Sequence, residues 1–336
     1  MEKVKIAIVG LGGIAQVVHL PILKKLPDVE ITAVCDIDTN KSKFVASKFG
    51  IKKSYKNFDL MLSENPEINA VIIATSTDSH TELAVKSFEA GKDVLIEKPI
   101  GRNYSETKLI VDSAAKNKKN LMVAMNNRFR GDAMLQRSFI RSGEIGDLFY
   151  IKTGWLKTQS STTKWFMQMD KSGGGVFIDN GIVMLDLGMW MLDFPEVYSV
   201  TSVNYYHNTK AVEDSNFTLI KLKNGSTLTI EVSWSLLRGG EFYYCNAFGK
   251  EGSSSINPLR IHKKINDELI EVTPKNTKTE HGFYKKSYEY QMKHFIGAVK
   301  GLYKIFSTGE EALKVMQIVD AVYASAKTNK EIIIKQ

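Results

Sequence analysis

The chain has 336 residues, enough for about two domains of ordinary size. Its 43% hydrophobic and 24% charged residues are typical of a folded globular protein and exclude a disordered one. The 45 basic and 37 acidic residues give a formal charge of +8 but are interleaved along the chain. We therefore expect a solvated surface and no nucleic-acid partner.

The sequence also argues against a membrane protein and a secreted, disulfide-rich one. No uncharged apolar stretch reaches the ~18 residues that a membrane-spanning helix needs. The N-terminus runs straight into a short apolar strand, without the longer apolar region of a signal peptide. Cys35 and Cys245 are the only cysteines, too few for a disulfide framework or a cysteine-based zinc site. We expect a cytoplasmic protein with no membrane partner and no bound metal.

Apolar runs alternate with helical patterns in the first third of the chain. The predicted buried strands are residues 4–9, 29–35, 70–74, 94–96 and 121–125, with a weaker one near 52–55. One predicted helix follows Ser79, where Glu82 has capping-box spacing, and ends at Gly91; another follows Asn103 and runs to about Asn117. This alternation predicts a doubly wound parallel sheet, the Rossmann arrangement.

Near residue 123 the predicted strands change to alternating polarity. Residues 228–234 place apolar side chains on one face, directly after the hairpin signal Asn224-Gly225. Further strands are predicted at 148–156, 197–206, 217–222, 242–248 and 259–263, and helices at about 180–191 and 288–327, the latter broken near 307–309. We predict domains at 1–122 and 123–336, the second an α/β domain with a large, open, mostly antiparallel sheet. Whether the C-terminal helix packs back on the first domain is left open.

A glycine-rich loop directly after the first strand is the first functional signal. Residues Gly10–Ala15 fit the pattern G-x-G-x-x-G/A. Its glycines permit a tight turn and a close approach of backbone to a pyrophosphate, and its third small residue lets helix and strand pack. Asp36 follows Ala15 by 21 residues, at the end of the second strand, where a carboxylate can accept both ribose hydroxyls. The unit predicts a dinucleotide cofactor.

Asp36 also bears on which dinucleotide binds. Its carboxylate would repel a 2′-phosphate, and Ile37 and Asp38 offer no cation to hold one. NAD(H) is therefore favoured. Lys41 and Lys43 lie nearby in the sequence and keep NADP(H) possible.

The second signal is Glu97-Lys98-Pro99 at the end of the fifth strand. Ligands bind at the carboxyl ends of such strands, so Lys98 could lie beside a nicotinamide. Glu97 could hold its ammonium, and Pro99 could follow a cis bond. A surface lysine at a strand end is the alternative.

Together these motifs resemble the Gfo/Idh/MocA oxidoreductases, the glucose–fructose oxidoreductase and inositol dehydrogenase group. The matching segments are 10–15, Asp36, 74–80, 97–99, 126–129, 173–175 with Asp179 after them, and 321–326. The resemblance implies a Rossmann domain followed by a C-terminal α/β domain. It also implies a homodimer or homotetramer, because the open face of the second sheet often makes subunit contacts in this family.

The resemblance further implies hydride transfer between nicotinamide and a hydroxyl or carbonyl carbon of a sugar, cyclitol or related polyol. In this family the lysine at Lys98 moves a proton or orients the hydroxyl, and the aspartate at Asp179 hydrogen-bonds the substrate. The expected cofactor contacts are Gly10, Gly12, Gly13, Ile14, Ala15, Asp36, Ile37, Ala74, Thr75, Ser76, His80, Glu97, Lys98 and Asn126. Expected substrate contacts are Arg128, Trp155, Trp165 and Asn180, although the two tryptophans could equally be core residues.

This chain departs from the family pattern at the usual proton donor. The family reads Asp-x-Gly-x-His, whereas residues 179–183 end in Val183, which carries no proton to give. Phe166 also replaces an arginine often found after the tryptophan. Either Lys98 acts with Asp179 alone, or another residue supplies the proton, or catalysis is lost. Candidates by residue type alone are Tyr284, Tyr288 and His281. We favour the enzyme; the alternative is a nucleotide-binding regulator of the same fold.

Overall fold

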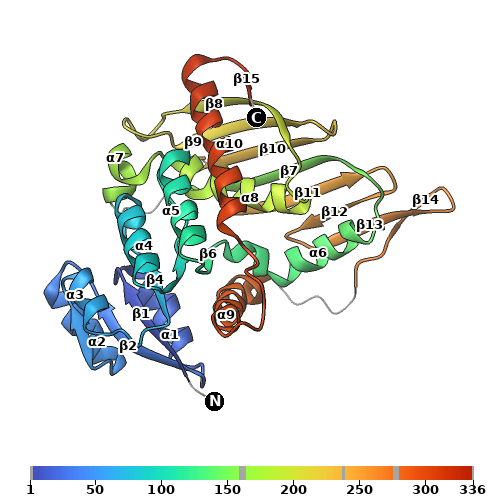
Figure 1. Ribbon diagram of the computed structural model, residues 1–336. Coiled ribbons are helices and arrows are strands. Elements are labelled where there is room, and N and C mark those ends of the chain that lie inside the picture. Colours follow the sequence, from blue (N-terminus) through green and yellow to red (C-terminus); the bar gives the residue numbers. More distant parts are fainter. Residues whose placement is uncertain (1–2, 159–163, 237–238, 275–279, 335–336) are drawn as a thin grey trace. The chain divides into compact units, whose positions relative to one another are not determined.

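The computed structural model describes residues 3–158, 164–236, 239–274 and 280–334. These residues form two compact units (Figure 1). The first unit runs through Asn126 and takes in a later segment, Tyr288–Leu313. The second comprises Asn127–Ser287 and the chain from Lys314 onward. The long helix α10 (Gly309–Thr328) therefore begins in one unit and ends in the other.

The first unit is built on one parallel sheet with the strand order β3-β2-β1-β4-β5-β6. Its strands are β1 (Val4–Val9), β2 (Val29–Cys35), β3 (Lys53–Tyr55), β4 (Ala70–Ile73), β5 (Asp93–Ile96) and β6 (Leu121–Val123). This order confirms the predicted Rossmann arrangement. It places the topological switch point between β1 and β4, at whose carboxyl ends such sheets bind ligands.

Helices connect these strands. They are η1 (Ala15–His19), α1 (Leu20–Leu23), α2 (Thr39–Phe49), α3 (Phe58–Ser63), η2 (Thr77–Ser79), α4 (His80–Glu89) and α5 (Tyr104–Lys116). A later helix, α9 (Glu280–Val299), begins in the second unit and contributes its residues from Tyr288 onward to this one. The predicted cap of α5 is confirmed, since the Asn103 side chain accepts a hydrogen bond from Glu106 N at 2.9 Å. Gly91, at φ +74°, follows α4 as predicted.

The predicted capping box at the start of α4 is wrong. The Ser79 hydroxyl does not cap this helix; it donates to Thr75 Oγ1 at 2.7 Å and lies 2.9 Å from Ser76 O. The cause is the short helix η2, which precedes α4 and gives Ser79 a helical backbone. A cap residue needs an extended backbone to turn its side chain toward the next turn.

The second unit contains a nine-stranded sheet in the order β14-β13-β12-β11-β7-β10-β9-β8-β15. Its strands are β7 (Leu148–Leu156), β8 (Val197–Tyr205), β9 (Ser215–Leu222), β10 (Thr227–Ser233), β11 (Phe242–Gly249), β12 (Gly252–Ile256), β13 (Arg260–Ile265), β14 (Glu268–Glu271) and β15 (Ile332–Ile333). Strands β7 and β10 pair in parallel, and the other described neighbours are antiparallel. The predicted mostly antiparallel sheet and its Asn224-Gly225 hairpin are confirmed.

One face of this sheet is covered by the buried helix α8 (Ile182–Met191). A Cβ on Gly188 would lie 2.6 Å from Leu228 Cδ1, so α8 packs closely on β10. The helix starts earlier than predicted, because a π-helical turn, η5 (Phe177–Gly181), leads into it. The unit's other helices are η3 (Asn126–Phe129), α6 (Gly131–Arg141), η4 (Lys164–Met167) and α7 (Met169–Ser172).

A buried ion pair joins α8 to the start of this unit. Arg128 Nε and Nη2 donate to Asp186 Oδ2 and Oδ1 at 2.8 and 2.6 Å, and both side chains are almost fully buried. The Arg128 guanidinium also lies 5.1 Å from the centre of the Phe194 ring. A buried bidentate pair restrains the relative orientation of the two side chains and also neutralises their charges.

We expect Asp186→Ala to destabilise the second unit by about 3–5 kcal/mol, because it leaves a buried guanidinium without its carboxylate. Urea denaturation followed by tryptophan fluorescence measures this loss. The matched control is Asp147→Ala, which removes an exposed carboxylate 3.0 Å from Lys250 Nζ and should cost less than about 1 kcal/mol. Equal losses in the two variants would refute the structural role of the Arg128–Asp186 pair.

Candidate functional site

The loop after β1 needs glycine at its first position for internal reasons. Gly10 has φ +84°, and a Cβ there would lie 2.6 Å from the backbone of Ala74 and Thr75. Its N–H donates to Cys35 O at 2.9 Å. Gly10 thus lets the carboxyl ends of β1, β2 and β4 come together without a side chain between them.

Gly12 and Gly13 have a different role, because nothing in the described parts of the chain crowds them. Both are exposed, and a Cβ on either would meet no described atom within 4 Å. Ile14 is half-buried and Ala15 is buried, where η1 begins. The open space over two glycines at the start of a helical segment suits a pyrophosphate, which binds to backbone N–H groups there.

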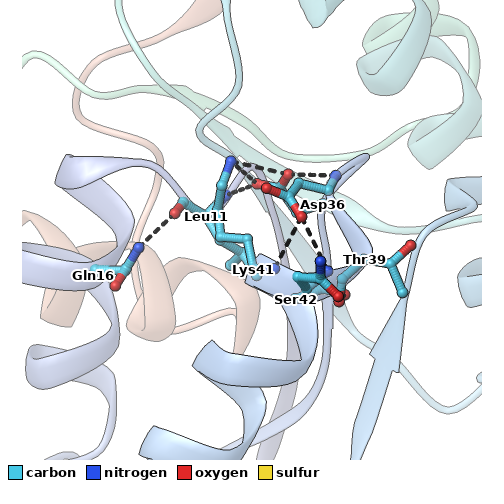
Figure 2. Close-up of polar contacts among 8 residues, drawn as sticks. Leu11, Gln16, Asp36, Thr39, Lys41 and Ser42 are labelled. Atoms are coloured by element: carbon cyan, nitrogen blue, oxygen red, sulfur yellow. Dashed lines mark hydrogen bonds and ion pairs between the residues drawn. The ribbon is translucent and has the colours of Figure 1, made fainter.

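Asp36 is fixed beside this loop by backbone and side-chain donors (Figure 2). Its Oδ2 accepts from Leu11 N at 2.8 Å, and its Oδ1 accepts from Asp38 N at 2.9 Å. Lys41 Nζ lies 3.1 Å from both oxygens. The carboxylate is 6% exposed, so its orientation is set before any ligand binds. Lys41, noted in the sequence as a possible phosphate ligand, is here the ion-pair partner of Asp36.

The next residue adds an apolar surface to the same edge of the sheet. Ile37 is 86% exposed, which is unusual for a large apolar side chain. An adenine ring needs such a flat apolar contact next to its ribose. The open glycines, the fixed carboxylate and the exposed isoleucine therefore fit a dinucleotide.

His80 ties the loop after β4 to the loop after β5. Its Nδ1 lies 3.0 Å from Pro99 O, and its Nε2 lies 3.3 Å from Thr75 O. Burial lowers the pKa of His80, although the carbonyl groups of Pro99 and Thr75 oppose the shift. Ala74 is buried, while Thr75 and Ser76 are half-buried at the strand end. The predicted contact of His80 with the cofactor stays a prediction.

The Glu97-Lys98-Pro99 segment lies at the carboxyl end of β5, as predicted, and its Lys98–Pro99 bond is cis. Lys98 is half-buried, and its N–H lies 3.3 Å from Glu97 Oε2. Glu97 Oε1 is 2.8 Å from Nε2 of His19, which is 1% exposed. This contact joins the end of η1 to the end of β5. No local pattern indicated a role for His19, because its partner is 78 residues away.

These observations bring the first unit's predicted cofactor residues to one edge of its sheet. Gly10–Ala15 follow β1, Asp36 follows β2, Ala74–Ser76 follow β4, and Glu97 and Lys98 follow β5. Carboxyl ends of parallel strands share an edge. Asn126, 7% exposed, lies just beyond β6 at the start of η3.

In the second unit, Asp179 lies within the π-helical turn η5, after the glycine triplet. Its N–H donates to Gly175 O at 3.2 Å, and its side chain is half-buried. Single π-helical turns within α-helices are frequent at functional sites. Val183, one turn further on, is 4% exposed and buried in the core. The structure thus gives position 183 a packing role.

The four predicted substrate residues differ in how far their polar groups are already bound. Arg128 is paired with Asp186, and Asn180 Oδ1 accepts from Trp234 Nε1 at 2.9 Å. The half-buried Trp155 hydrogen-bonds to Glu241, and half-buried Trp165 stacks on Phe166 with ring centres 3.8 Å apart. Arg128 and Asn180 therefore have structural partners in the second unit. Their contact with a substrate stays a prediction, as it does for the tryptophans.

Of the candidate second proton donors, Tyr284 is 43% exposed and Tyr288 is half-buried. The His281 side chain lies outside the described residues. Within the described parts of the chain, no group of three or more metal-ligating side chains gathers at one point. None of the described helices combines the length and the apolar character needed to cross a bilayer.

Comparison with protein families identifies the family to which the chain belongs. The model of an oxidoreductase family with an NAD-binding Rossmann fold matches residues 4–125. The model of that family's C-terminal alpha/beta domain matches residues 137–334. The chain belongs to the Gfo/Idh/MocA oxidoreductase family. The first unit therefore contains the NAD-binding domain of a Gfo/Idh/MocA protein, and the family's C-terminal domain takes in most of the second unit together with Tyr288–Leu313 of the first.

Individual relatives match over long stretches at modest identity. D-glucoside 3-dehydrogenase of Escherichia coli is 27% identical, over 98% of this chain and 97% of that protein. The scyllo-inositol 2-dehydrogenase (NAD(+)) of Bacillus subtilis is 28% identical, over 77% of this chain and 75% of its own. The solved structure of a levoglucosan dehydrogenase with NADH and levoglucosan has a TM-score of 0.89 at 20% identity, covering 100% of both chains. At that identity the structure shows the shared fold.

We expect NADH to bind more tightly than NADPH, because the Asp36 carboxylate opposes a 2′-phosphate. Lys41→Met should lower NADPH affinity a further 2- to 5-fold or so relative to NADH, since it removes a partly exposed countercharge. Fluorescence titration with both nucleotides measures the ratio. Lys43→Met, an exposed lysine on the same helix, is the control and should leave it unchanged. Tighter binding of NADPH by the wild-type protein would contradict the prediction.

Proposed function

We propose that this protein is an NAD(H)-dependent oxidoreductase acting on a hydroxyl or carbonyl carbon of a sugar, cyclitol or related polyol. The observation that carries the proposal is the preformed nucleotide site, with its open glycines and fixed Asp36, in a family of oxidoreductases. The curated relatives named above act on glucosides and inositols, which supports the substrate class.

The proposed mechanism divides the chemistry between nucleotide and protein. Bound nicotinamide supplies the hydride acceptor or donor. When a hydroxyl is oxidised, the proton on its oxygen must leave as the C–H hydride departs, and we assign that proton to Nζ of Lys98, which accepts it as a neutral amine and becomes an ammonium. In the reverse direction Lys98 returns it to the carbonyl oxygen. Asp179 would accept a hydrogen bond from a substrate hydroxyl and so orient the ring.

Val183 makes Lys98 the main proton group in this proposal. The side chain is buried and carries no exchangeable proton, so η5 and α8 offer no histidine-like donor at that position. Losing one of two proton groups typically slows a reaction by 10²–10⁴-fold but leaves it measurable. The same residue favours the second candidate, a nucleotide-binding regulator without turnover.

Lys98→Ala and Asp179→Asn should each lower kcat/KM by about 10²–10⁴-fold, because each removes a group assigned to the proton or the substrate. NADH affinity of Asp179→Asn should stay unchanged, since Asp179 belongs to the other unit. Absorbance of NADH, recorded over a panel of sugars, cyclitols and keto-sugars, gives the rates. Lys108→Ala, on the exposed side of α5, is the control. Tight NADH binding without turnover on any compound would favour the regulator.

We also propose that the protein forms a homodimer or homotetramer through the open face of its nine-stranded sheet. Val203 of β8 and Phe217 of β9 are directly paired across the strands, yet they are 40% and 47% exposed. Phe242 of β11 is also 40% exposed. Neighbouring apolar side chains on a sheet face are typical of a surface that another chain covers.

The double variant Val203→Glu/Phe217→Glu should convert the oligomer to a monomer, because it would bury four uncompensated charges across a twofold interface. Light scattering after size-exclusion chromatography measures the mass. The control is Leu60→Glu, an equally exposed apolar residue on α3. A wild-type monomer, or an oligomer that survives the double substitution, would refute the assignment.

A cytoplasmic location completes the proposal. Cys35 and Cys245 are both free and buried. Free thiols without disulfides fit a reducing compartment.

A further inference from the structure

A buried carboxylate, Glu213, lies against the glycine turn that precedes Asp179. It is 1% exposed. Its Oε1 accepts hydrogen bonds from Phe177 N and from the Tyr323 hydroxyl, both at 2.9 Å. Gly175 N lies 3.0 Å from Oε2 and 3.1 Å from Oε1. One side chain thus binds two backbone N–H groups at the start of η5 and a tyrosine of α10.

Two glycines of the turn, Gly174 and Gly175, are explained by how closely Tyr323 and the Glu213 backbone pack against them. A Cβ on Gly175 would lie 2.0 Å from Glu213 O, and a Cβ on Gly174 would lie 2.0 Å from the Tyr323 hydroxyl. The Glu213 carbonyl also accepts from Val176 N at 2.9 Å. The turn therefore fits around Glu213 and Tyr323 with no space for a side chain at either glycine.

Burying the Glu213 carboxylate raises the free energy of the folded protein unless its hydrogen bonds are kept. Burial raises the pKa of Glu213, and the hydrogen bonds from Phe177, Tyr323 and Gly175 oppose that shift. The start of a helical segment further favours negative charge. Because a buried carboxylate without these donors would be strongly unfavourable, the turn and Glu213 must hold their relative positions together.

The residues on both sides of Asp179 are held by hydrogen bonds. On its N-terminal side, its N–H donates to the carbonyl of Gly175, whose own N–H is held by Glu213. On its C-terminal side, Asn180 is held by Trp234 Nε1. The Asp179 side chain itself remains half-buried. The backbone of Asp179 is thus fixed on both sides, while the residue as a whole is only half-buried.

We propose that Glu213, bridged to α10 by Tyr323, is a positioning residue that sets the orientation of Asp179 toward the substrate. This inference rests on the proposed role of Asp179. Glu213 acts on the substrate step and not on nucleotide binding, because its contacts lie within the second unit. Misplacing a substrate-binding group by about 1 Å can cost up to 10²-fold in rate.

Two conservative variants test the proposal. Glu213→Gln keeps the size of the side chain but turns an NH₂ group toward a backbone N–H, and Tyr323→Phe removes a single hydroxyl. We expect each to lower kcat/KM by about 10- to 100-fold on the best sugar of the panel, with NADH affinity unchanged. Glu331→Gln, which loses an exposed carboxylate bound to Ser199 and Lys221 in the same unit, should have no effect.

A double-mutant comparison separates positioning from a general structural role. If Glu213 acts through Asp179, Glu213→Gln should cost little further in the Asp179→Asn background. An equal loss in both backgrounds, or no loss in the wild-type background, would overturn the inference. An Asp179→Asn variant with full activity would instead remove the proposed function of Asp179, and the inference with it.

Hydrogen exchange gives a readout that needs no turnover. In Glu213→Gln and in the milder Tyr323→Phe, amides of residues 173–183 should exchange faster, while the same peptide in Glu331→Gln should match the wild type. Unchanged protection of this peptide in both variants would show that Glu213 does not hold the turn. That result would overturn the inference even in a protein without measurable activity.

Discussion

Buried carboxylates bound by backbone N–H groups are the constraint on which the candidate residues of each unit depend. Asp36 holds Leu11 and Asp38 at the end of β2, and Glu213 holds Gly175 and Phe177 at the start of η5. Charge-assisted hydrogen bonds of this kind are stronger than neutral ones, and they are lost as a set if the backbone moves. Each carboxylate therefore makes a glycine-containing loop rigid at the point where a ligand is expected.

The two carboxylates differ in what remains available to a ligand. Glu213 is enclosed by protein donors, Tyr323 included, so its function is internal. Asp36 has two backbone donors and the partly exposed Lys41, whose side chain can move when a ribose approaches. Held in this way, Asp36 keeps a fixed direction and a partly compensated charge. Because Lys41 offsets part of its charge, Asp36 repels a 2′-phosphate less strongly than a carboxylate without a cationic partner would.

Most of the first unit could be predicted from sequence, because its signals are local. The glycine loop, Asp36 and the cap at Asn103 each depend on residues a few positions apart or on one strand–helix–strand unit. Partners far away in the sequence could not be found in this way. Glu97 lies 78 residues from His19, and Trp234 lies 54 residues from Asn180. Tyr323 lies 110 residues from Glu213. Motif recognition located the Gly173–Gly175 triplet without giving its physical reasons. These are the close packing of Glu213 and Tyr323 on Gly175 and Gly174, and the positive φ of +83° at Gly173.

The resemblance to the family places a histidine where this chain has Val183, and this expectation changes what the rest of the proposed site must supply. A site with one proton group must obtain more of its rate from orientation, because transfer to a single base requires the hydroxyl to point at it. The backbone around Asp179 is restrained on both sides. Glu213 binds the preceding turn, and Trp234 binds the following residue. Val183, in the first turn of α8, is instead buried in the core. On the proposed mechanism, therefore, the rigidity of η5 compensates in part for the absence of a proton group at Val183, and the loss of that rigidity should lower the rate more here than in an enzyme with two proton groups.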